Sequence, residues 1–381
     1  MITKKSIILS LLYVGLTCCI FINVISADKK KMKPNPKLVA LADNTAIDLG
    51  SFKWEIPKGE PQSGKVTDYS GMTYDIHNNR ILLFGGGHSA TWTDSIYAFE
   101  FKTLNPHFKS LYTPTPHKFY TKDNSDRAFW KAGETGNYPR PIGRHTYDLL
   151  IVPVDRKELL MLRHGTGPSR AGKSSGLGYT GGAVGIFDFK KEKWSMVDKK
   201  NMGDFGGYGG SAEYDPISKR VIGMSQKHIW AFDPKTKTTV KIISWYSDKK
   251  EYKGASSYSG SVVYYPPDKK MYAFGKGQVW SINLNRQDLK KTTLTKIGLI
   301  PEEKKGYPVF NYDSKNKVLG GGPTNNKFYV FDPRTKKWDS KDIKGGQPGS
   351  MRSWCLSYSS LENAYIFISA KNKVWAYRWK K

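Results

Sequence analysis

A short pattern recurs six times along the chain, and this repetition restricts its folds more than any other feature. Each unit has an apolar stretch that often ends in Tyr-Asp, a tight turn, a second apolar stretch, a glycine-rich loop and a third stretch that often ends in Phe-Asp. Several units add a fourth stretch with a Trp. The units begin near residues 71, 144, 211, 261, 309 and 353. Short apolar stretches separated by turns predict strands, so each unit is expected to form a four-stranded antiparallel sheet.

Four-stranded sheets repeated along a chain pack radially into a β-propeller, and closure of the ring protects the sheet edges. The sixth unit lacks a fourth strand, and residues 46–54 have the pattern of one. We therefore predict an all-β propeller of six blades over residues 45–381, with a ring closed by an N-terminal strand. Residues 112–142 fit either a long insertion or part of a seventh blade. The 37 Gly and 20 Pro residues agree with a fold rich in turns.

The glycine loop after each second strand and the Phe-Asp and Trp positions resemble kelch repeats. The resemblance covers nearly all of the chain after its N-terminal segment. It implies a kelch-like β-propeller, and because propellers host many functions it implies no single activity.

The N-terminus has the pattern of an export signal. Two lysines precede an apolar run over residues 7–25, and Ser26-Ala27 offers small residues for cleavage. This predicts a signal peptide over residues 1–27 and a secreted or periplasmic protein. The apolar run is also long enough for an uncleaved membrane anchor, and that alternative stays open.

The segment after the signal, residues 28–44, is rich in Lys and Pro and predicts an exposed linker. Cleavage would leave Cys355 as the only cysteine, which excludes an internal disulfide and a cysteine metal cluster in the mature chain. We expect no membrane span after cleavage, and we expect a monomer.

Charge points to the class of partner. The chain has a formal net charge of +28, and the signal removes only Lys4 and Lys5. Such an excess attracts polyanions over long distances, and salt weakens the attraction. For an exported protein we expect an acidic polysaccharide; nucleic acid is not expected, because no recognised motif for binding it is present. A surface made lysine-rich for solubility, with pairs such as Lys269-Lys270 in turns, stays open as the alternative.

One unit departs from the others in its first strand. When the first strands are aligned on their tyrosines, His145 is the one polar member of an otherwise apolar set, and Arg144 beside it has no counterpart. A core histidine bonded to a backbone group is the alternative interpretation. Neighbouring residues of a strand alternate faces. Two sets of residues are then expected to face the central channel. The residues directly before the tyrosines are Thr73, Thr146, Glu213, Val263, Asn311 and Ser357, and those two positions earlier are Gly71, Arg144, Ser211, Ser261, Val309 and Cys355.

Further polar residues are expected at the end of the propeller where the first strands begin. They follow second strands or precede first strands, where glycines let a loop fold tightly and project a side chain. For His88 and Tyr208, a turn or packing role stays open. The candidates besides Arg144 and His145 are His88, Arg163, His164, Tyr208, Lys227 and Tyr258.

This set suits β-elimination at a uronate. Cations or hydrogen-bond donors neutralise the carboxylate, so that the neighbouring proton becomes more acidic. A histidine or tyrosine removes that proton, and a tyrosine hydroxyl protonates the leaving glycosidic oxygen. No metal is required and no cofactor is expected, although a bound metal ion stays open. The residues expected to bind the substrate are Arg144, Arg163, Lys227, Tyr258 and His88.

Two histidines on consecutive strands of one blade, with a tyrosine opening the next blade, resemble the site of the β-propeller ulvan lyases, a family of polysaccharide lyases. The resemblance implies that His145 and Tyr208 form the acid–base pair and that His164 contacts the uronate carboxylate. It also implies an arginine on the strand after the tyrosine. Gln226-Lys227 stands there instead, so Lys227 would have to supply the charge.

Three other chemistries fit the sequence less well. Glycoside hydrolysis needs two carboxylates at a suitable separation, and the channel set offers Glu213 alone. A copper-radical oxidase needs histidine ligands near Cys355, and the unit that contains Cys355 has none. Zinc binding by His88, His145 and His164 matches no compact motif. The main alternative to a lyase is a non-catalytic exported propeller that binds an acidic glycan or a protein partner.

Overall fold

The computed structural model describes residues 32–60, 66–86, 93–126, 129–134, 136–162, 183–198, 209–244, 252, 260–305 and 309–381. By its contacts the chain divides into residues 1–33 and residues 34–381, and the second unit is described below. None of its described helices is long and apolar enough to cross a membrane. These short helices are α2 (Pro36–Ala40), η1 (His117–Phe119), η4 (Leu289–Lys291) and η5 (Glu302–Lys304).

Six sheets of four or five strands lie within the described ranges. The first contains, in order of pairing, β3 (Met72–Asp75), β4 (Arg80–Leu83), β5 (Tyr97–Glu100), β6 (His107–Ser110) and β2 (Lys53–Trp54). The second contains β10 (Leu150–Ile151), β11 (Glu158–Met161), β12 (Ala183–Asp188) and β13 (Lys193–Asp198). The third contains β14 (Ser211–Asp215), β15 (Arg220–Met224), β16 (His228–Asp233) and β17 (Thr238–Ser244).

In the remaining three sheets, as in the second and third, neighbouring strands pair antiparallel; in the first sheet β2 pairs parallel with β6. The fourth contains β18 (Ser261–Tyr265), β19 (Lys270–Gly275), β20 (Gln278–Asn283) and β21 (Thr293–Leu299). The fifth contains β22 (Asn311–Asp313), β23 (Val318–Thr324), β24 (Lys327–Asp332) and β25 (Lys337–Asp342). The sixth contains β26 (Met351–Ser359), β27 (Ala364–Ser369), β28 (Lys373–Arg378) and β1 (Thr45–Ser51).

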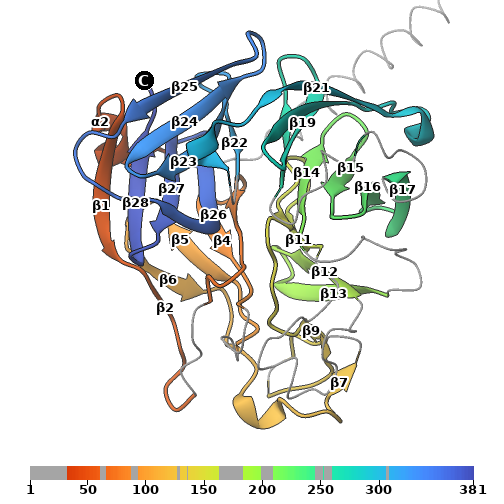
Figure 1. Cartoon of the computed structure of the whole chain (residues 1–381). Coiled ribbons are helices and arrows are strands. Elements are labelled where there is room, and N and C mark those ends of the chain that lie inside the picture. Colours follow the sequence, from red (N-terminus) through yellow and green to blue (C-terminus); the bar gives the residue numbers. More distant parts are fainter. Residues whose placement is uncertain are drawn as a thin grey trace, which may run out of the picture. The chain divides into compact units, whose positions relative to one another are not determined.

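The first strands of the sheets form a closed circuit. Strand β3 contacts β10, the contacts continue through β14, β18 and β22 to β26, and β26 contacts β3 again. Figure 1 shows the sheets of this circuit arranged around a common centre. These strands therefore surround a central channel, which confirms the predicted all-β propeller. The strands behind them are buried on both faces: all residues of β27 are buried, as expected for sheets packed between neighbouring sheets.

The ring closes through the N-terminal segment, as predicted. Strand β1 pairs antiparallel with β28, from Thr45 opposite Arg378 to Ser51 opposite Lys373. Phe52, which is 3% exposed, is buried at the point where the chain leaves this sheet. The next two residues pair as β2 with β6, so one segment joins the sixth sheet to the first.

The exposed linker predicted for residues 28–44 is wrong for its second half. Helix α2 inserts Leu38, which is fully buried, into the core formed by the first and sixth sheets. Arg378 donates a hydrogen bond of 2.5 Å to the Leu38 carbonyl oxygen, and the Asn35 backbone N–H donates one of 2.7 Å to Glu362. Apolar burial and these long-range bonds make the helix part of the propeller.

The first strand of the second sheet lies later in the chain than the sequence predicts. The Arg144–Asp148 stretch was expected to be this strand, but the β10–β11 ladder pairs Leu150 with Met161 and Ile151 with Leu160. The backbone of Tyr147 has a left-handed φ of 49°, which bends the chain before β10 begins. Arg144–Asp148 therefore lies outside the ladder and makes only single bridges to neighbouring sheets.

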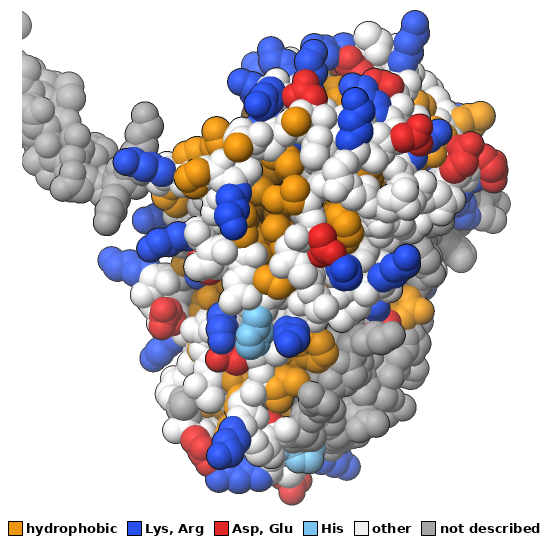
Figure 2. Space-filling view, turned by 90° about the vertical axis from the view of Figure 1, so that its left-hand side faces the viewer, with side chains coloured by type: hydrophobic (Ala, Val, Ile, Leu, Met, Phe, Trp, Pro, Cys, Tyr) orange, Lys and Arg blue, Asp and Glu red, His pale blue; other side chains and the backbone are white. Residues whose placement is uncertain are grey.

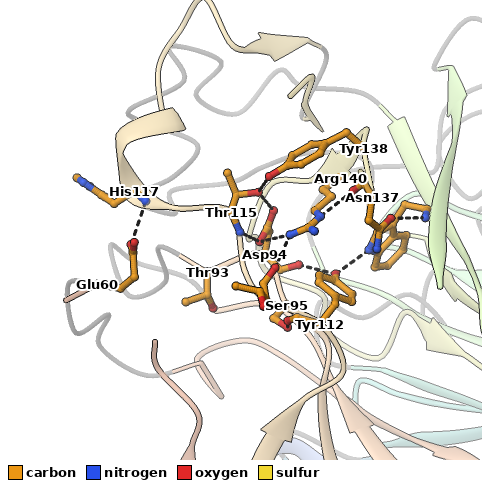
Figure 3. Close-up of polar contacts among 12 residues, drawn as sticks. Glu60, Thr93, Asp94, Ser95, Tyr112, Thr115, His117, Asn137, Tyr138 and Arg140 are labelled. Atoms are coloured by element: carbon orange, nitrogen blue, oxygen red, sulfur yellow. Dashed lines mark hydrogen bonds and ion pairs between the residues drawn. The ribbon is translucent and has the colours of Figure 1, made fainter. Parts of the chain in front are cut away.

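Residues 112–142 form an insertion and no part of the ring, because β3 of the first sheet contacts β10 of the second directly. A small sheet contains β7 (Ser125–Asp126), β8 (Phe129–Trp130) and β9 (Arg140–Pro141). A buried network connects it to the first two sheets (Figure 3). The Arg140 guanidinium lies 4.7 Å from the ring centres of both Tyr112 and Tyr138, and its Nη1 is 3.9 Å from Asp94.

The Asp94 carboxylate of this network also accepts hydrogen bonds. Thr115 donates to Asp94 through its backbone N–H at 2.8 Å and its hydroxyl at 2.5 Å. Burial raises the pKa of Asp94, and the Arg140 charge opposes that rise. Both partners are at most 1% exposed, so removal of either leaves the other charge buried without compensation.

We predict that Arg140→Met lowers the free energy of unfolding by about 3–5 kcal/mol, the usual effect of breaking a buried ion pair. Urea denaturation at neutral pH measures this. Lys118→Ala is the matched control in the same insertion: Lys118 pairs with Glu134, but both side chains are more than half exposed (66% and 53%). Its change should stay within about 0.5 kcal/mol. Equal effects of the two variants would contradict the structural role of the network.

Candidate functional site

The structure describes three of the eight predicted site residues. Arg144, His145 and Lys227 lie within the described ranges. His88, Arg163, His164, Tyr208 and Tyr258 lie outside the described residues, and their roles stay predictions.

His145 is buried in an aromatic group at the start of the first strands. Its ring stacks on Tyr69 with 4.6 Å between ring centres, and its Nδ1 forms a 3.1 Å hydrogen bond with the Tyr147 hydroxyl. The edge of Tyr147 also meets Trp354 at 5.2 Å. With 3% of its surface exposed, His145 has the packing of a core histidine. We call Tyr69, His145, Tyr147 and Trp354 the His145 cluster.

The backbone of this cluster has an unusual conformation. Tyr69, Tyr147 and Trp354 have φ values of 53°, 49° and 61°, in the left-handed region that bulky residues rarely adopt. Each such residue costs on the order of 1–3 kcal/mol and persists only where the surroundings hold it. The stacked rings, the His145–Tyr147 hydrogen bond and a 2.8 Å hydrogen bond from the Tyr147 backbone N–H to the Tyr69 carbonyl oxygen are among the contacts that hold these residues.

Arg144 is also buried, with no exposed surface. Its Nε donates a 2.7 Å hydrogen bond to the Ile142 carbonyl oxygen, and its guanidinium lies 5.8 Å from the Phe129 ring centre. Lys227 is exposed in the loop after β15, where its backbone N–H donates to Ser225. The structure therefore places Arg144 in the packing between the insertion and the second sheet, and only Lys227 at the surface.

A cavity of about 310 Å³ lies in the channel and is lined by residues of all six first strands. Its lining extends to Ile76, Val154, Ser314 and Ser360, which follow the first strands, so the cavity opens at the end where first strands turn into second strands. We call it the channel pocket. It lies toward the other end of these strands from the His145 cluster.

Three of the residues predicted to face the channel, Thr73, Glu213 and Asn311, line this pocket. Thr146, Val263 and Ser357 do not line it; for Thr146 the reason is that the first strand of its unit was predicted too early in the chain. For the same reason the sequence interpretation missed Asp148, which lines the pocket and was taken for the Tyr-Asp end of a strand. The sequence did contain a signal. In this unit Tyr147-Asp148 lies well before the turn at Asp155, whereas in the first, third and fifth units Tyr-Asp directly precedes the turn.

Two carboxyl groups dominate the chemistry of the channel pocket. Burial raises the pKa of Asp148 to about 6, while hydroxyl donors oppose the shift: Ser211 lies 2.5 Å and Ser261 3.4 Å from Asp148 Oδ2. Burial raises the pKa of Glu213 to about 8; the Tyr214 backbone N–H lowers it, and the Asp148 charge adds to the rise. At neutral pH Asp148 is mostly ionised and Glu213 mostly protonated.

The end of the propeller at which the channel pocket opens carries many exposed lysines. In an antiparallel sheet of four strands, the first and third turns lie at one end. We call the exposed lysines of these turns in the second to fifth sheets the lysine turns. They are Lys157, Lys190, Lys191, Lys193, Lys219, Lys235, Lys237, Lys269, Lys270, Lys290, Lys291, Lys315, Lys317, Lys336 and Lys337.

Acidic side chains in these turns are bonded to the turns themselves. Asp233 accepts the backbone N–H of Lys235 at 2.8 Å, and Asp188 accepts those of Lys190 and Lys191 at 2.8 and 2.9 Å. The Lys191 N–H is the main reason that the pKa of Asp188 is lowered. These carboxylates thus stabilise the turn backbone. Three of the ammonium groups also pair with a carboxylate: Lys191 with Asp188, Lys219 with Asp155 and Lys291 with Asp288.

Metal and thiol chemistry receive no support from the described residues. They contain no group of three or more His, Cys, Asp or Glu side chains that could hold a metal ion. Cys355 is fully buried, its Sγ donates to the Ser70 carbonyl oxygen at 3.5 Å, and burial raises its pKa to about 12. A thiol in that state is inert.

Comparisons with known proteins add little about function. No family model matches the chain, and no curated protein matches it. Among solved structures, a structural genomics protein of unknown function from Bacteroides thetaiotaomicron VPI-5482 is similar at 11% identity and a TM-score of 0.48, over 89% of this chain and 73% of that one. A chain of the mitotic checkpoint complex is similar at 7% identity and a TM-score of 0.48, over 93% of this chain and 98% of that one.

We predict that Glu213→Gln raises stability relative to the unchanged protein as the pH increases. The pKa of Glu213 is raised from 4.5 to about 8 in the folded state, so the protonated form is the one that favours folding. That contribution is complete below pH 4.5 and is lost as the pH rises through 8, whereas glutamine stays neutral. The advantage of the variant should reach on the order of 2–4 kcal/mol at pH 8.5, since one pKa unit corresponds to about 1.4 kcal/mol.

Urea denaturation at half-unit pH steps from 4.5 to 8.5 measures the difference. Glu192→Gln, at an exposed turn of the second sheet, is the control and should show no pH-dependent advantage. A stability difference for Glu213→Gln that stays constant over this range would show that the carboxyl group titrates normally.

Proposed function

We propose that the protein is a kelch-type propeller that binds an acidic polysaccharide through the lysine turns. The observation that carries the proposal is the repetition of exposed lysines at equivalent turns of four neighbouring sheets, combined with a net charge of +28. A regular series of charges suits a polymer with regularly spaced anions better than a single small anion.

Electrostatics supports this class of ligand. Several turn carboxylates are bonded to the turn backbone, and three of them pair with Lys191, Lys219 and Lys291. The other ammonium groups of the lysine turns set the potential at this end. Elsewhere too, as Figure 2 illustrates for one side of the molecule, Lys and Arg side chains are spread widely over the surface and Asp and Glu are fewer. Such a field accelerates encounter with a polyanion, and the lysine turns then give the chain a place to bind.

An exported location agrees with this ligand. The proposed signal peptide over residues 1–27 would bring the protein to a compartment where acidic polysaccharides are the abundant polyanions. Because the binding depends on exposed ammonium groups, it should weaken steeply with salt.

A polysaccharide lyase similar to the ulvan lyases is the second candidate, and one observation favours it. Three residues of the His145 cluster hold left-handed backbone conformations, and such conformations concentrate at active sites. In this proposal His145 and Tyr208 serve as base and acid, His164 contacts the uronate carboxylate, and Lys227 supplies the positive charge. His145, at 3% exposure, would have to become accessible when substrate binds.

For the binding proposal, we predict that the triple variant Lys315→Gln, Lys317→Gln and Lys336→Gln weakens binding to an acidic polysaccharide about tenfold at low salt. Each exposed charge contributes roughly 0.5 kcal/mol, and 1.4 kcal/mol corresponds to a factor of ten. Calorimetric titration with polygalacturonate, ulvan and chondroitin sulfate at 50 and 200 mM NaCl measures the loss, with dextran as the neutral polymer.

A matched control removes the same charge from the opposite end of the propeller. Lys276, Lys344 and Lys371 are exposed and lie in loops away from the lysine turns. Lys276 has a left-handed backbone, as Lys317 and Lys336 of the first variant do. The control variant should bind within about twofold of the unchanged protein. Equal losses in the two triple variants would show that only net charge matters, and this outcome would contradict a site at the lysine turns.

For the lyase candidate, incubation with ulvan should produce the ultraviolet absorbance of unsaturated uronates, and Tyr208→Phe should abolish it. His145→Asn should abolish it as well, but should also lower stability by about 1–3 kcal/mol, because it removes a buried hydrogen bond. Tyr147→Phe is the control, since it removes the partner hydroxyl and leaves the imidazole. Binding without an absorbance increase on any polysaccharide of the panel would leave the binding function alone.

A further inference from the structure

The channel pocket is acidic inside a strongly basic protein. The chain has 61 Lys and Arg residues against 33 Asp and Glu, yet the described residues that line the pocket include Asp148 and Glu213 and no Lys or Arg. Most of its other lining is apolar or hydroxyl-bearing. A ligand that enters this pocket therefore meets negative charge that no cation of the lining neutralises.

Both carboxyl groups are fixed, and each keeps a free oxygen. Ser211 and Ser261 both donate to Oδ2 of Asp148, and the Tyr214 backbone N–H donates to Oε1 of Glu213. Within the described part of the chain, Asp148 Oδ1 and Glu213 Oε2 have no hydrogen-bond donor. A carboxylate can accept about four hydrogen bonds, so both groups retain capacity for a ligand donor.

Aromatic side chains complete the wall near the mouth. Tyr74, Tyr312 and Tyr358 line the pocket. The hydroxyls of Tyr74 and Tyr358 each donate a 3.0 Å hydrogen bond to an asparagine of their own turn, Asn79 and Asn363, which keeps these groups in place. Carboxylates together with aromatic rings are the surroundings that proteins use to bind ammonium groups.

We propose that the channel pocket binds a small zwitterion, about the size of a monosaccharide, whose ammonium group pairs with Asp148 and Glu213. The pocket volume of about 310 Å³ is at the lower end of the range for organic ligands, roughly 300–1,000 Å³. A Ca²⁺ ion usually takes six to eight oxygens, and two carboxyl groups supply too few of them.

The charges beside the mouth of the channel pocket indicate which group the outer end of the ligand should have. Lys315 directly follows Ser314, which lines the mouth, and Lys219 pairs with Asp155 directly after Val154 of the mouth. The Lys219 charge is balanced by Asp155, so Lys315 supplies the positive charge beside the entrance, and negative charge lies deeper. This gradient orients a ligand with its ammonium group inward and an anionic group outward, and it disfavours a simple cation.

Binding should be linked to protons. The titratable groups that face Glu213 are Asp148 and the tyrosines of the wall, and the pKa values of Tyr74 and Tyr312 are raised by burial, so these stay neutral. An ammonium group favours the ionised form of Glu213, whose pKa without ligand is about 8. Binding at pH 7 therefore releases a proton from Glu213, and affinity increases from pH 6 until the ligand's own ammonium group begins to lose its proton.

The test is calorimetric titration of the full chain with glucosamine 6-sulfate, glucosamine and glucose 6-sulfate at pH 7. We expect glucosamine 6-sulfate to bind at least tenfold more tightly than either of the others, with a heat that depends on the ionisation enthalpy of the buffer. Glu213→Gln and Asp148→Asn should each weaken it at least tenfold. Both variants are neutral and nearly isosteric, and Glu192→Gln should bind like the unchanged protein.

Three results would overturn the proposal: equal affinities for the three sugars, no binding up to 10 mM, and tighter binding of CaCl₂ than of glucosamine 6-sulfate. Lys219 and Lys315 belong both to the lysine turns and to the surroundings of the mouth, but the two carboxyl groups of the channel pocket take no part in polysaccharide binding. Glu213→Gln should leave polygalacturonate binding unchanged, so failure of one proposal is distinguishable from failure of the other.

Discussion

The pairing of β1 with β28 is the interaction on which the rest of the structure depends. It joins residues at opposite ends of the propeller and converts a row of sheets into a ring. Asn44 and Tyr377 reinforce it with a 2.7 Å side-chain hydrogen bond. Only in a closed ring do the six first strands face one another, so the channel pocket and its two carboxyl groups exist because this ladder forms. Loss of the ladder would expose two sheet edges and open the pocket.

Repetition made the architecture predictable from the sequence, including the strand donated by the N-terminus. A repeat pattern is redundant, so an error in one unit leaves the fold assignment intact. The second unit shows the limit. Its Tyr147-Asp148 pair imitates the end of a first strand, but the strand is Leu150–Ile151. A shift in strand position changes the predicted direction of every side chain, and Asp148 was therefore missed as a channel residue.

The candidate site was predictable only where a unit follows the common repeat pattern. Glu213 was expected in the channel, and it lines the pocket, because its unit follows the common pattern. His145 and Arg144 attracted attention as polar residues in unusual positions, and both are buried. Composition and spacing do not distinguish a polar residue that binds a ligand from one that fills a contact between the insertion and a blade. That distinction depends on contacts such as Arg144 with Phe129, which only the three-dimensional arrangement provides.

The lysine turns and the channel pocket differ both in the sign of their charge and in their solvent exposure, and this difference has a functional consequence. The lysine turns are in water, where a Debye length of about 8 Å at physiological salt screens each charge. Asp148 and Glu213 are within the channel, where burial shifts both pKa values upward and screening by salt is weaker. Polymer binding at the turns should therefore respond strongly to salt and little to pH near neutrality. A ligand in the channel should show the reverse dependence, so ionic strength and pH separate the two surfaces without any mutation.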